Sequence, residues 1–215
     1  TPYASGAQST TINITDLAGN LGSSVVNFTI SDTTPPGTPA SAPDLQAASD
    51  TGTSSTDNIT NDTTPSFDVV CTEAGSTITL YDASLVVRGT VSCTGAGTTT
   101  LTASPALTSA TYLMTYTETD AAGNASGQSP SLSVTVDATA PTVSITSVGG
   151  DSSAPYTTAD TTPDIVVVTT VGDTVTSTGF TCTPTPASGA SVTCTRTTPY
   201  ASGAQSTTIN ITDLA

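Results

Sequence analysis

The residues best suited to chemistry in this chain are aspartates that recur in loops rich in Ser, Thr and Gly. Asp50, Asp57 and Asp62 follow one another with D-x6-D-x4-D spacing in one such loop. Carboxylates held close together repel one another unless a cation neutralises them, and Ca²⁺ accepts carboxylate, amide and carbonyl oxygens from irregular loops. The spacing is not that of an EF-hand. The loop is therefore a candidate Ca²⁺ site, and the alternative is that these Asp residues only decorate the loop and keep the chain soluble.

The net charge of the chain points to cations as partners. Fifteen Asp and two Glu face only Arg88 and Arg196, which gives a net charge of −15. Such a surface repels nucleic acid and anionic membranes. No apolar run approaches the ~20 residues needed to span a bilayer. We therefore expect no nucleic-acid partner and no membrane span in this segment.

The residue types needed for catalysis are largely missing. The chain contains no His and no Lys, so a serine-based triad would lack its base. The carboxylates lie in repeated turns and form no unique constellation of the kind that marks an active site. The sequence therefore predicts a protein that is not an enzyme.

The four cysteines predict two disulfide bonds. Cys71, Cys93, Cys182 and Cys194 include no CxxC pair, and no His is present to complete a zinc site. An even count without metal-ligand spacing favours disulfides in an oxidising compartment. Three pairings are possible, and proximity along the chain favours Cys71–Cys93 and Cys182–Cys194. The alternative is that the thiols are free and buried as small hydrophobes.

The elements that must position these residues are β-strands. Thr contributes 51 of the 215 residues, and strong helix formers are scarce, which is a composition typical of strands and turns. Short alternating segments separated by turn residues, about seven to a module with a short first strand near Asp44, predict β-sandwiches of immunoglobulin type. The predicted strands are 23–32, 66–73, 76–82, 85–93, 98–103, 111–119, 131–137, 142–148, 164–171, 173–182, 190–196 and 206–213.

An internal repeat organises the chain. Residues 1–18 and 198–215 are identical, which defines a period of 197 residues, and repeats of this kind indicate a tandem array. Weaker matches pair TDLAGN (15–20) with TDAAGN (119–124), and NDTTPSFDVV (61–70) with ADTTPDIVVV (159–168). Proline-containing linkers at 32–37 and 137–142 mark boundaries. We therefore expect the chain to start and stop inside a domain. The predicted domains are 1–34, the last strands of a preceding module B; 35–137, module A; and 138–215, a module B without its last strand.

These motifs resemble a known family. The strings SDTGTSSTDNITNDTTPSF (49–67), TDAAGN (119–124) and VDATAP (136–141) are similar to the bacterial Ig-like repeats of giant surface adhesins, including the biofilm-associated and type I-secreted adhesins. The resemblance implies an extracellular location at the bacterial cell surface. It also implies that the domains stack head to tail as extenders, with Ca²⁺ at and near the joints, and carry a distant tip that binds a host or surface ligand.

The resemblance also extends the candidate metal site. It places the TDAAGN turn near the loop of Asp50, so that Asp120 and Asn124 join the ligand set. The alternative for both TDxAGN motifs is a hydrogen-bonded turn, capped by Asp and with Gly at positive φ. The full set of predicted metal ligands is Asp50, Asp57, Asp62, Asp120, Asn124 and the linker residue Asp137 for module A, Asp16, Asn20 and the linker residue Asp32 for the first repeat copy, and Asp151, Asp160 and Asp213 for module B.

Three functions remain open from the sequence. The leading prediction is a structural extender, stalk or filament whose partners are adjacent copies of the same repeat, because a stalk needs one mechanical element many times. The second is a module that binds a glycan, ice or a host receptor. The third is polymerisation by strand exchange, in which a neighbour's residues 19–34 complete module B. A continuous array explains the duplicated 18 residues more simply than exchange does.

Overall fold

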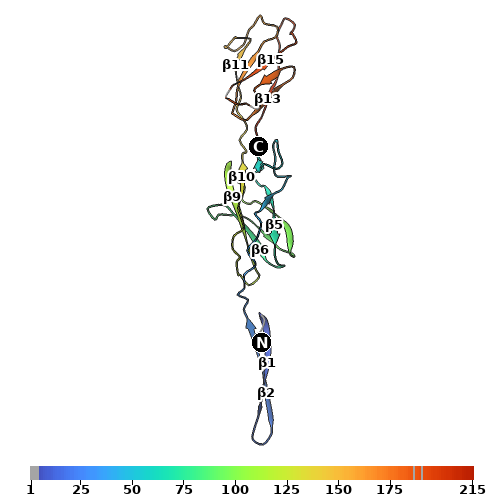
Figure 1. Cartoon of the computed structure of the whole chain (residues 1–215), viewed down its shortest axis with the longest axis vertical. Helices are drawn as coiled ribbons and strands as arrows, with labels where there is room; N and C mark the ends of the chain where they lie inside the picture. The colour runs from blue at the N-terminus through green and yellow to red at the C-terminus, as the bar shows by residue number, and fades with distance from the viewer. Residues whose placement is uncertain (1–4, 186, 190) are drawn as a thin grey trace. The chain divides into compact units, whose positions relative to one another are not determined.

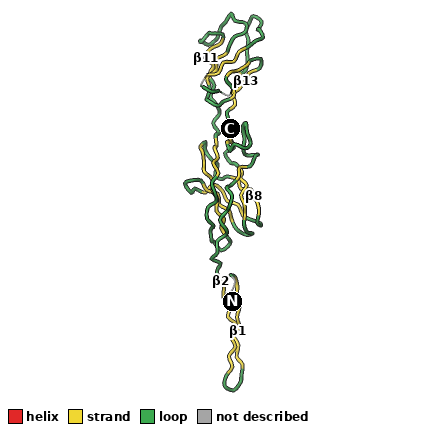
Figure 2. Tube along the Cα trace, in the orientation of Figure 1, coloured by secondary structure: helices red, strands yellow, loops and turns green. Residues whose placement is uncertain are grey.

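The chain folds entirely into strands, turns and loops. A computed structural model describes residues 5–185, 187–189 and 191–215, and none of these residues is helical (Figure 2). In this part of the chain, no helix has the length and apolar character needed to cross a membrane. The predicted all-β architecture is confirmed. The strands are β1 (Gly6–Thr15), β2 (Leu21–Ile30), β3 (Asp44–Leu45), β4 (Ile59–Thr60), β5 (Ser66–Cys71), β6 (Thr77–Tyr81), β7 (Val87–Ser92), β8 (Gly97–Thr102), β9 (Ala110–Thr119), β10 (Leu132–Val136), β11 (Ser144–Val148), β12 (Ile165–Val168), β13 (Thr174–Ser177), β14 (Thr181–Thr183), β15 (Ser191–Thr195) and β16 (Ile209–Thr212).

The chain separates into two compact units that interleave along the sequence. Unit 1 comprises Thr1–Asp44, Ser66–Pro105 and Tyr112–Ser133, and unit 2 comprises Leu45–Pro65, Ala106–Thr111 and Val134–Ala215. This division passes through the segment 35–137. The boundaries predicted from the sequence repeat therefore stay a prediction.

Unit 1 contains a long hairpin formed by the first repeat copy. β1 pairs with β2 in antiparallel register from Gly6↔Ile30 to Thr15↔Leu21, and Figure 1 draws this ribbon in blue. Several of its large apolar side chains are exposed, including Ile14 and Val25. A two-stranded hairpin buries little apolar surface on its own and is marginally stable in water.

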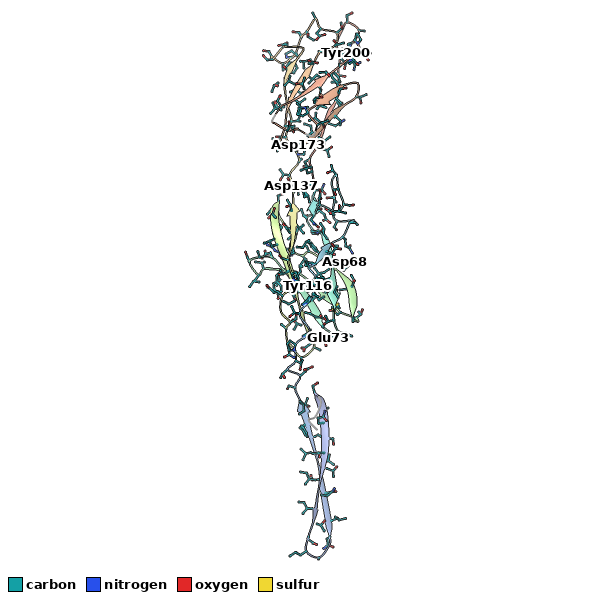
Figure 3. The ribbon with its side chains drawn as sticks, in the orientation of Figure 1. Asp68, Glu73, Tyr116, Asp137, Asp173 and Tyr200 are labelled. Atoms are coloured by element: carbon teal, nitrogen blue, oxygen red, sulfur yellow. A yellow bond between two sulfur atoms is a disulfide. The ribbon has the colours of Figure 1, made fainter. Side chains whose placement is uncertain are left out.

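The other strands of unit 1 enclose a packed core. β5 pairs with β8, while β6 pairs with β7 on one side and β9 on the other, all antiparallel. The fully buried Phe67 and Val69 alternate along β5 as a half-buried strand requires. Tyr116 of β9, labelled in Figure 3, is fully buried, and its hydroxyl accepts a hydrogen bond from the Val70 N–H at 3.3 Å. This bond ties β9 to β5.

Unit 2 contains a short parallel pair and a second sandwich. Ile59 and Thr60 of β4 pair with Thr135 and Val136 of β10. Further along, one sheet has the order β11-β12-β15-β14 and a second pairs β13 with β16. We call residues 142–215 the C-terminal sandwich. Its core is formed by side chains of both sheets: Ile165, Val167, Val175, Cys182, Ala187, Val192 and Cys194, with the partly buried Val148, Phe180, Ile209 and Ile211 packed against them.

Two strand predictions are wrong in detail. The segment 173–182, predicted as one strand, is split into β13 and β14, which belong to different sheets. Gly179 has φ 80° and the Phe180 N–H donates to the Ser177 carbonyl at 3.3 Å, so the chain turns between them. Strand β4 was not predicted at all, because Ile59 stands alone among polar residues and no alternation is visible there.

Both predicted disulfides are confirmed. Cys71 and Cys93 are bonded with a Cα–Cα distance of 5.8 Å, and Cys182 and Cys194 with a Cα–Cα distance of 3.8 Å. The first bond links the end of β5 to the residue after β7, and these strands lie in different sheets. The second links directly opposite residues of β14 and β15. All four sulfurs lie in buried residues.

Candidate metal-binding loops

The two TDxAGN motifs form the same hydrogen-bonded turn. Asp120 Oδ1 accepts from the Ala122 and Asn124 N–H groups, both at 2.8 Å, and Asp120 Oδ2 accepts from Asn124 Nδ2 at 2.8 Å. Asp16 makes the equivalent bonds to Ala18 N at 2.9 Å and to Asn20 N and Nδ2 at 2.8 Å. The two motifs differ at one position and form the same turn. This turn is the Asp-capped turn that the sequence offered as the alternative to a metal site.

Glycine and the carboxylate charge maintain this turn. Gly123 has φ 94° and Gly19 has φ 88°, a region that L side chains rarely adopt. The hydrogen bond from the Asn124 side chain lowers the pKa of Asp120, and the bond from Asn20 lowers the pKa of Asp16 in the same way. Both carboxylates are therefore held in the ionised, acceptor form.

The Asp50 loop places its three aspartates in different environments. Asp50 is almost fully buried; its Oδ2 accepts from the Asn58 N–H at 3.2 Å, and its Oδ1 is buried with no hydrogen-bond partner. Asp57 Oδ1 accepts from the Ile59 N–H at 3.1 Å, and Asp62 Oδ1 accepts from the Thr64 N–H at 2.8 Å. Asp57 and Asp62 thus form Asx turns. Asp50 alone carries an oxygen that lacks the partner buried carboxylates need.

The other predicted ligands also accept hydrogen bonds from nearby N–H groups. Asp160 Oδ1 accepts from the Thr162 N–H at 2.8 Å, repeating the Asp62 turn in the matching DTTP string. The remaining acceptors are Asp32 Oδ1 from Thr34 N at 3.0 Å, Asp137 Oδ1 from Thr139 N at 3.0 Å, Asp213 Oδ1 from Ala215 N at 3.2 Å, and Asp151 from Ser153 N at 3.0 Å and Thr157 N at 2.7 Å. The Thr157 and Ser153 amides lower the pKa of Asp151. Each acid is built into a local turn.

The structure does not gather these acids into one cluster. Among the residues described, no group of three or more His, Cys, Asp and Glu side chains could hold a metal ion. Two longer-range bonds involve predicted ligands: Asn124 Nδ2 donates to the Asp32 carbonyl at 3.2 Å, and the Asp137 N–H donates to the Thr60 carbonyl at 2.8 Å. The orphaned Oδ1 of Asp50 is the feature that fits a hard cation, because a buried carboxylate oxygen requires a donor or a metal.

Sequence reasoning missed the most deeply buried acid of unit 1. Glu118 on β9 is fully buried, and its carboxylate accepts from the Thr72 N–H (2.9 and 3.0 Å), the Thr72 hydroxyl (2.7 Å), the Glu73 N–H (3.2 Å) and the Ser76 hydroxyl. Burial alone would raise its pKa, but the bonds from Ser76 and Thr72 lower it. Glu118 thus joins β9 to the turn after β5. The signal was available, since Met114, Tyr116 and Glu118 alternate on one face of β9.

Two further carboxylates have similar structural roles. Asp173 is buried and accepts from the Thr170 N–H at 3.0 Å and from the Thr169 hydroxyl. Asp82 accepts two bonds from Arg88, at 2.9 Å from Nε and 2.7 Å from Nη2. Burial would raise the pKa of Asp82, and the Arg88 bonds lower it. These acids stabilise local turns.

The C-terminal sandwich carries a cavity of about 840 Å³. The residues that line it include the apolar Ile145, Val148 and Phe180, together with Tyr200 and the segment 201–207. Figure 3 labels Tyr200 at the end of this sandwich opposite to Asp173. The guanidinium of Arg196 lies 3.8 Å from the centroid of the Tyr200 ring and 5.5 Å from that of Phe180.

Comparison with known proteins identifies one family. Residues 37–138 match the family described as "Bacterial Ig-like domain". No curated protein sequence matches the chain.

Two solved structures are similar to the chain at low sequence identity. One is described as the BSP domain of a biofilm associated protein, with a TM-score of 0.32, 21% identity, and coverage of 63% of this chain and 20% of that one. The other is described as a tetra-tandem repeat in the extending region of a large adhesion protein, with a TM-score of 0.32, 20% identity, and coverage of 98% and 49%. The chain therefore spans less than half the length of either.

Proposed function

Residues 37–138 match the bacterial Ig-like domain family, and from this match we propose that the chain is a structural extender: a stalk- or filament-forming repeat of a long protein at a bacterial cell surface. Its partners are adjacent copies of the same repeat. Its work is mechanical reach and stiffness, with no catalytic step.

The observation that carries this proposal is the identical repeat. Residues 1–18 recur without change at 198–215, and an array that spans distance needs one element many times. Three further features suit a load-bearing module. Each cysteine pair closes a loop, Glu118 joins a strand to a distant turn, and the TDxAGN turn is rebuilt with the same bonds in two places.

We further propose that Ca²⁺ stiffens the array. Asp50 would contribute its Oδ1, the buried oxygen without a donor. Asp57 and Asp62 each commit Oδ1 to a turn and would contribute further oxygens, with Asp120, Asn124 and Asp137 as the remaining candidates. Bound Ca²⁺ would neutralise carboxylates in a chain of net charge −15. The acids of the first copy and of the C-terminal sandwich, among them Asp16, Asp151 and Asp213, would act in the same way.

The experiment is a length series. Recombinant arrays of one, two, three and four periods are imaged by negative-stain electron microscopy and measured by small-angle X-ray scattering. A stiff extender lengthens by a constant amount of roughly 80 Å per period, because each module spans roughly ten residues of strand plus its loops. A flexible chain lengthens with the square root of the repeat number. Square-root growth, or collapse into a compact particle, would refute the proposal.

A ligand-binding repeat is the second candidate function, and the cavity beside Phe180 and Tyr200 is the observation in its favour. Aromatic side chains beside hydroxyl and amide groups are typical of sites for sugars and other small polar ligands. Titration of the chain with a panel of oligosaccharides would test it, with Tyr200→Ala as the variant that should lose binding.

A further inference from the structure

A buried threonine joins the two ends of the loop that precedes β4. Thr60 is fully buried, and its hydroxyl donates to the Ser49 carbonyl at 2.5 Å and accepts from the Asp62 N–H at 2.9 Å. The Thr51 hydroxyl lies 2.9 Å from the same oxygen. A buried hydroxyl needs hydrogen-bond partners, and here those partners come from both sides of one loop. The Thr60 hydroxyl therefore closes this loop at its base.

Two further bonds close the same loop. The Asn61 N–H donates to Thr51 Oγ1 at 2.9 Å, and the Asn58 N–H donates to Asp50 Oδ2 at 3.2 Å. Between these bonds, residues 52–57 are mostly exposed, as is typical of a surface loop. The structure thus offers a short route across the base of the loop, through hydrogen bonds, and a longer covalent route around it.

The strand that carries Thr60 is bonded to the last strand of the segment 37–138. β4 and β10 pair in parallel. The Thr135 N–H donates to the Asn58 carbonyl, and the Asp137 N–H donates to the Thr60 carbonyl, both at 2.8 Å. β10 leads directly into the proline-containing linker, so β4 holds the strand through which the chain leaves this segment.

The parallel arrangement determines how tension acts on these bonds. In a parallel pair, the chain enters both strands at the same end. Tension along the chain therefore pulls β4 toward its amino end and β10 toward its carboxyl end. The two strands would have to slide past each other, which loads the bonds between them together. In a hairpin pulled from its open end, by contrast, the bonds break one after another.

We propose that Thr60, together with the pair β4–β10, is a tension latch. A pull from the amino-terminal side reaches the base of the loop at Ser49, and the Thr60 hydroxyl transfers it to β4 and so to β10. The loop 52–57 stays slack. Such a latch matters only in a chain that bears load, so it rests on the proposed function as an extender, and it determines how long the segment stays folded under tension.

The first test is force-clamp optical tweezers on the 215-residue chain, held by its two ends in EDTA so that bound metal plays no part. Dithiothreitol identifies the opening of the segment 37–138. Reduction of Cys71–Cys93, with a separation of 22 residues, should lengthen that event by about 75 Å at about 3.4 Å per residue. Reduction of Cys182–Cys194, with a separation of 12 residues, should add only about 40 Å to a different event.

The variant Thr60→Val keeps the shape of the side chain and removes the hydroxyl. We expect its lifetime at constant force to be at least about 10-fold shorter, because a tenfold change in rate corresponds to the loss of one or two hydrogen bonds. Thr90→Val is the matched control at an exposed position of β7 and should leave the lifetime unchanged. A Thr60→Val lifetime equal to that of Thr90→Val would contradict the latch.

A core variant separates the latch from general stability. Leu80 of β6 is fully buried, so Leu80→Ala should unfold at a lower urea concentration. Its lifetime under force should stay within about 3-fold of the unaltered chain, because the core is still packed when the latch breaks and therefore does not affect the rate. If Leu80→Ala shortens the lifetime as much as Thr60→Val does, resistance to force comes from the whole domain and the proposal is wrong.

The second test leaves Thr60 in place. Six Gly and Ser residues are inserted between Ser55 and Thr56, in the exposed part of the loop. Because the latch bypasses the loop, the extension reached before rupture should be unchanged. An added length of about 20 Å before rupture would show that tension passes around the loop and would overturn the proposal. Neither failure would alter the growth of particle length with repeat number, which tests the extender separately.

Discussion

Replacing Glu118 by Gln should destabilise its module more than any other single change to a charged side chain. The buried carboxylate accepts bonds from two backbone N–H groups and two hydroxyls, those of Thr72 and Ser76. Gln has nearly the same shape, so packing is preserved. Its amide carries one oxygen and one NH₂ group in place of two acceptor oxygens. The NH₂ group must therefore face donors.

The magnitude follows from the number of bonds that the amide cannot accept. Thr72 N and Thr72 Oγ1 both donate to Oε2, at 2.9 and 2.7 Å, and the Ser76 hydroxyl and Glu73 N–H donate to Oε1. Whether the NH₂ group of Gln takes the position of Oε1 or that of Oε2, two hydrogen-bond donors lose their charged acceptor. Hydrogen bonds to charged groups contribute about 1.5–3 kcal/mol each, and hydroxyls can rotate to recover part of this. We expect a loss of about 3 kcal/mol at pH 7, equivalent to a fall in Tm of about 12–24 °C for a domain of this size.

The lowered pKa of Glu118 also makes the stability of the folded chain depend on pH. The pKa of Glu118 in the folded chain lies below its usual value of 4.5, so the unfolded chain binds more protons in this range. Its contribution is complete above about pH 4.5 and is lost as pH falls through the lower, folded pKa. The difference in unfolding free energy between the unaltered chain and Glu118→Gln should therefore shrink as the pH falls below about 4.5.

Differential scanning calorimetry of both proteins from pH 3 to pH 7 is the assay, with pH values chosen around the usual carboxyl range. Glu73→Gln is the control, since Glu73 is the other glutamate of the chain and its side chain is exposed. It should change stability by less than about 0.5 kcal/mol. If Glu118→Gln melts like Glu73→Gln at pH 7, or if its deficit does not depend on pH, the reasoning fails.

Three further predictions concern the metal, the disulfides and the turns. Excess free Ca²⁺ at about 100 times the dissociation constant of a site should stabilise the part of the chain that holds that site by about 2.7 kcal/mol relative to EDTA. Asp50→Asn should remove the stabilisation that comes from the Asp50 loop, whereas Asp44→Asn, at an exposed position outside the predicted set, should keep it. Replacing both Cys71 and Cys93 by Ala should cost about 3 kcal/mol in urea unfolding, because their bond closes a loop with a sequence separation of 22 residues; no loss would show that the fold does not need the bond. Gly123→Ala should lower the free energy of unfolding by about 1–2 kcal/mol, because Gly123 has φ 94°. Gly95→Ala is the control: a Cβ added at either glycine meets no atom within 4 Å, but Gly95 has no positive φ. In thermal melting, Gly95→Ala should therefore change stability little.

The sequence alone was sufficient for the features that depend on local pattern. Alternation of apolar residues located most strands, because the period of two in a strand determines which side chains can be buried together. Cysteine count and proximity were enough for Cys71–Cys93 and Cys182–Cys194. For the Asp-x-Ala-Gly-Asn string, the sequence offered the capped turn as the alternative to a metal site, because Asp can cap the backbone and Gly can supply the positive φ within five residues.

Sequence patterns could not determine which polar groups are buried. Asp50 and Asp57 look alike in a Ser/Thr-rich loop, yet Asp50 is buried with an oxygen lacking a partner and Asp57 is exposed. Glu118 lies on the inward face of an alternating strand, but only the turn at residues 72–76, far away in sequence, supplies the donors that make its burial tolerable. Whether a charge can be buried depends on its non-local partners.

The identical 18 residues make this division explicit. The sequence determined the repeat, the all-β class and the pairing capacity of the strand, because these depend on composition and local order. Tertiary structure decided that one copy forms a long strand while the other is irregular over half its length. A strand is completed by hydrogen bonds to a neighbouring strand, and that neighbour is absent from the segment's own sequence.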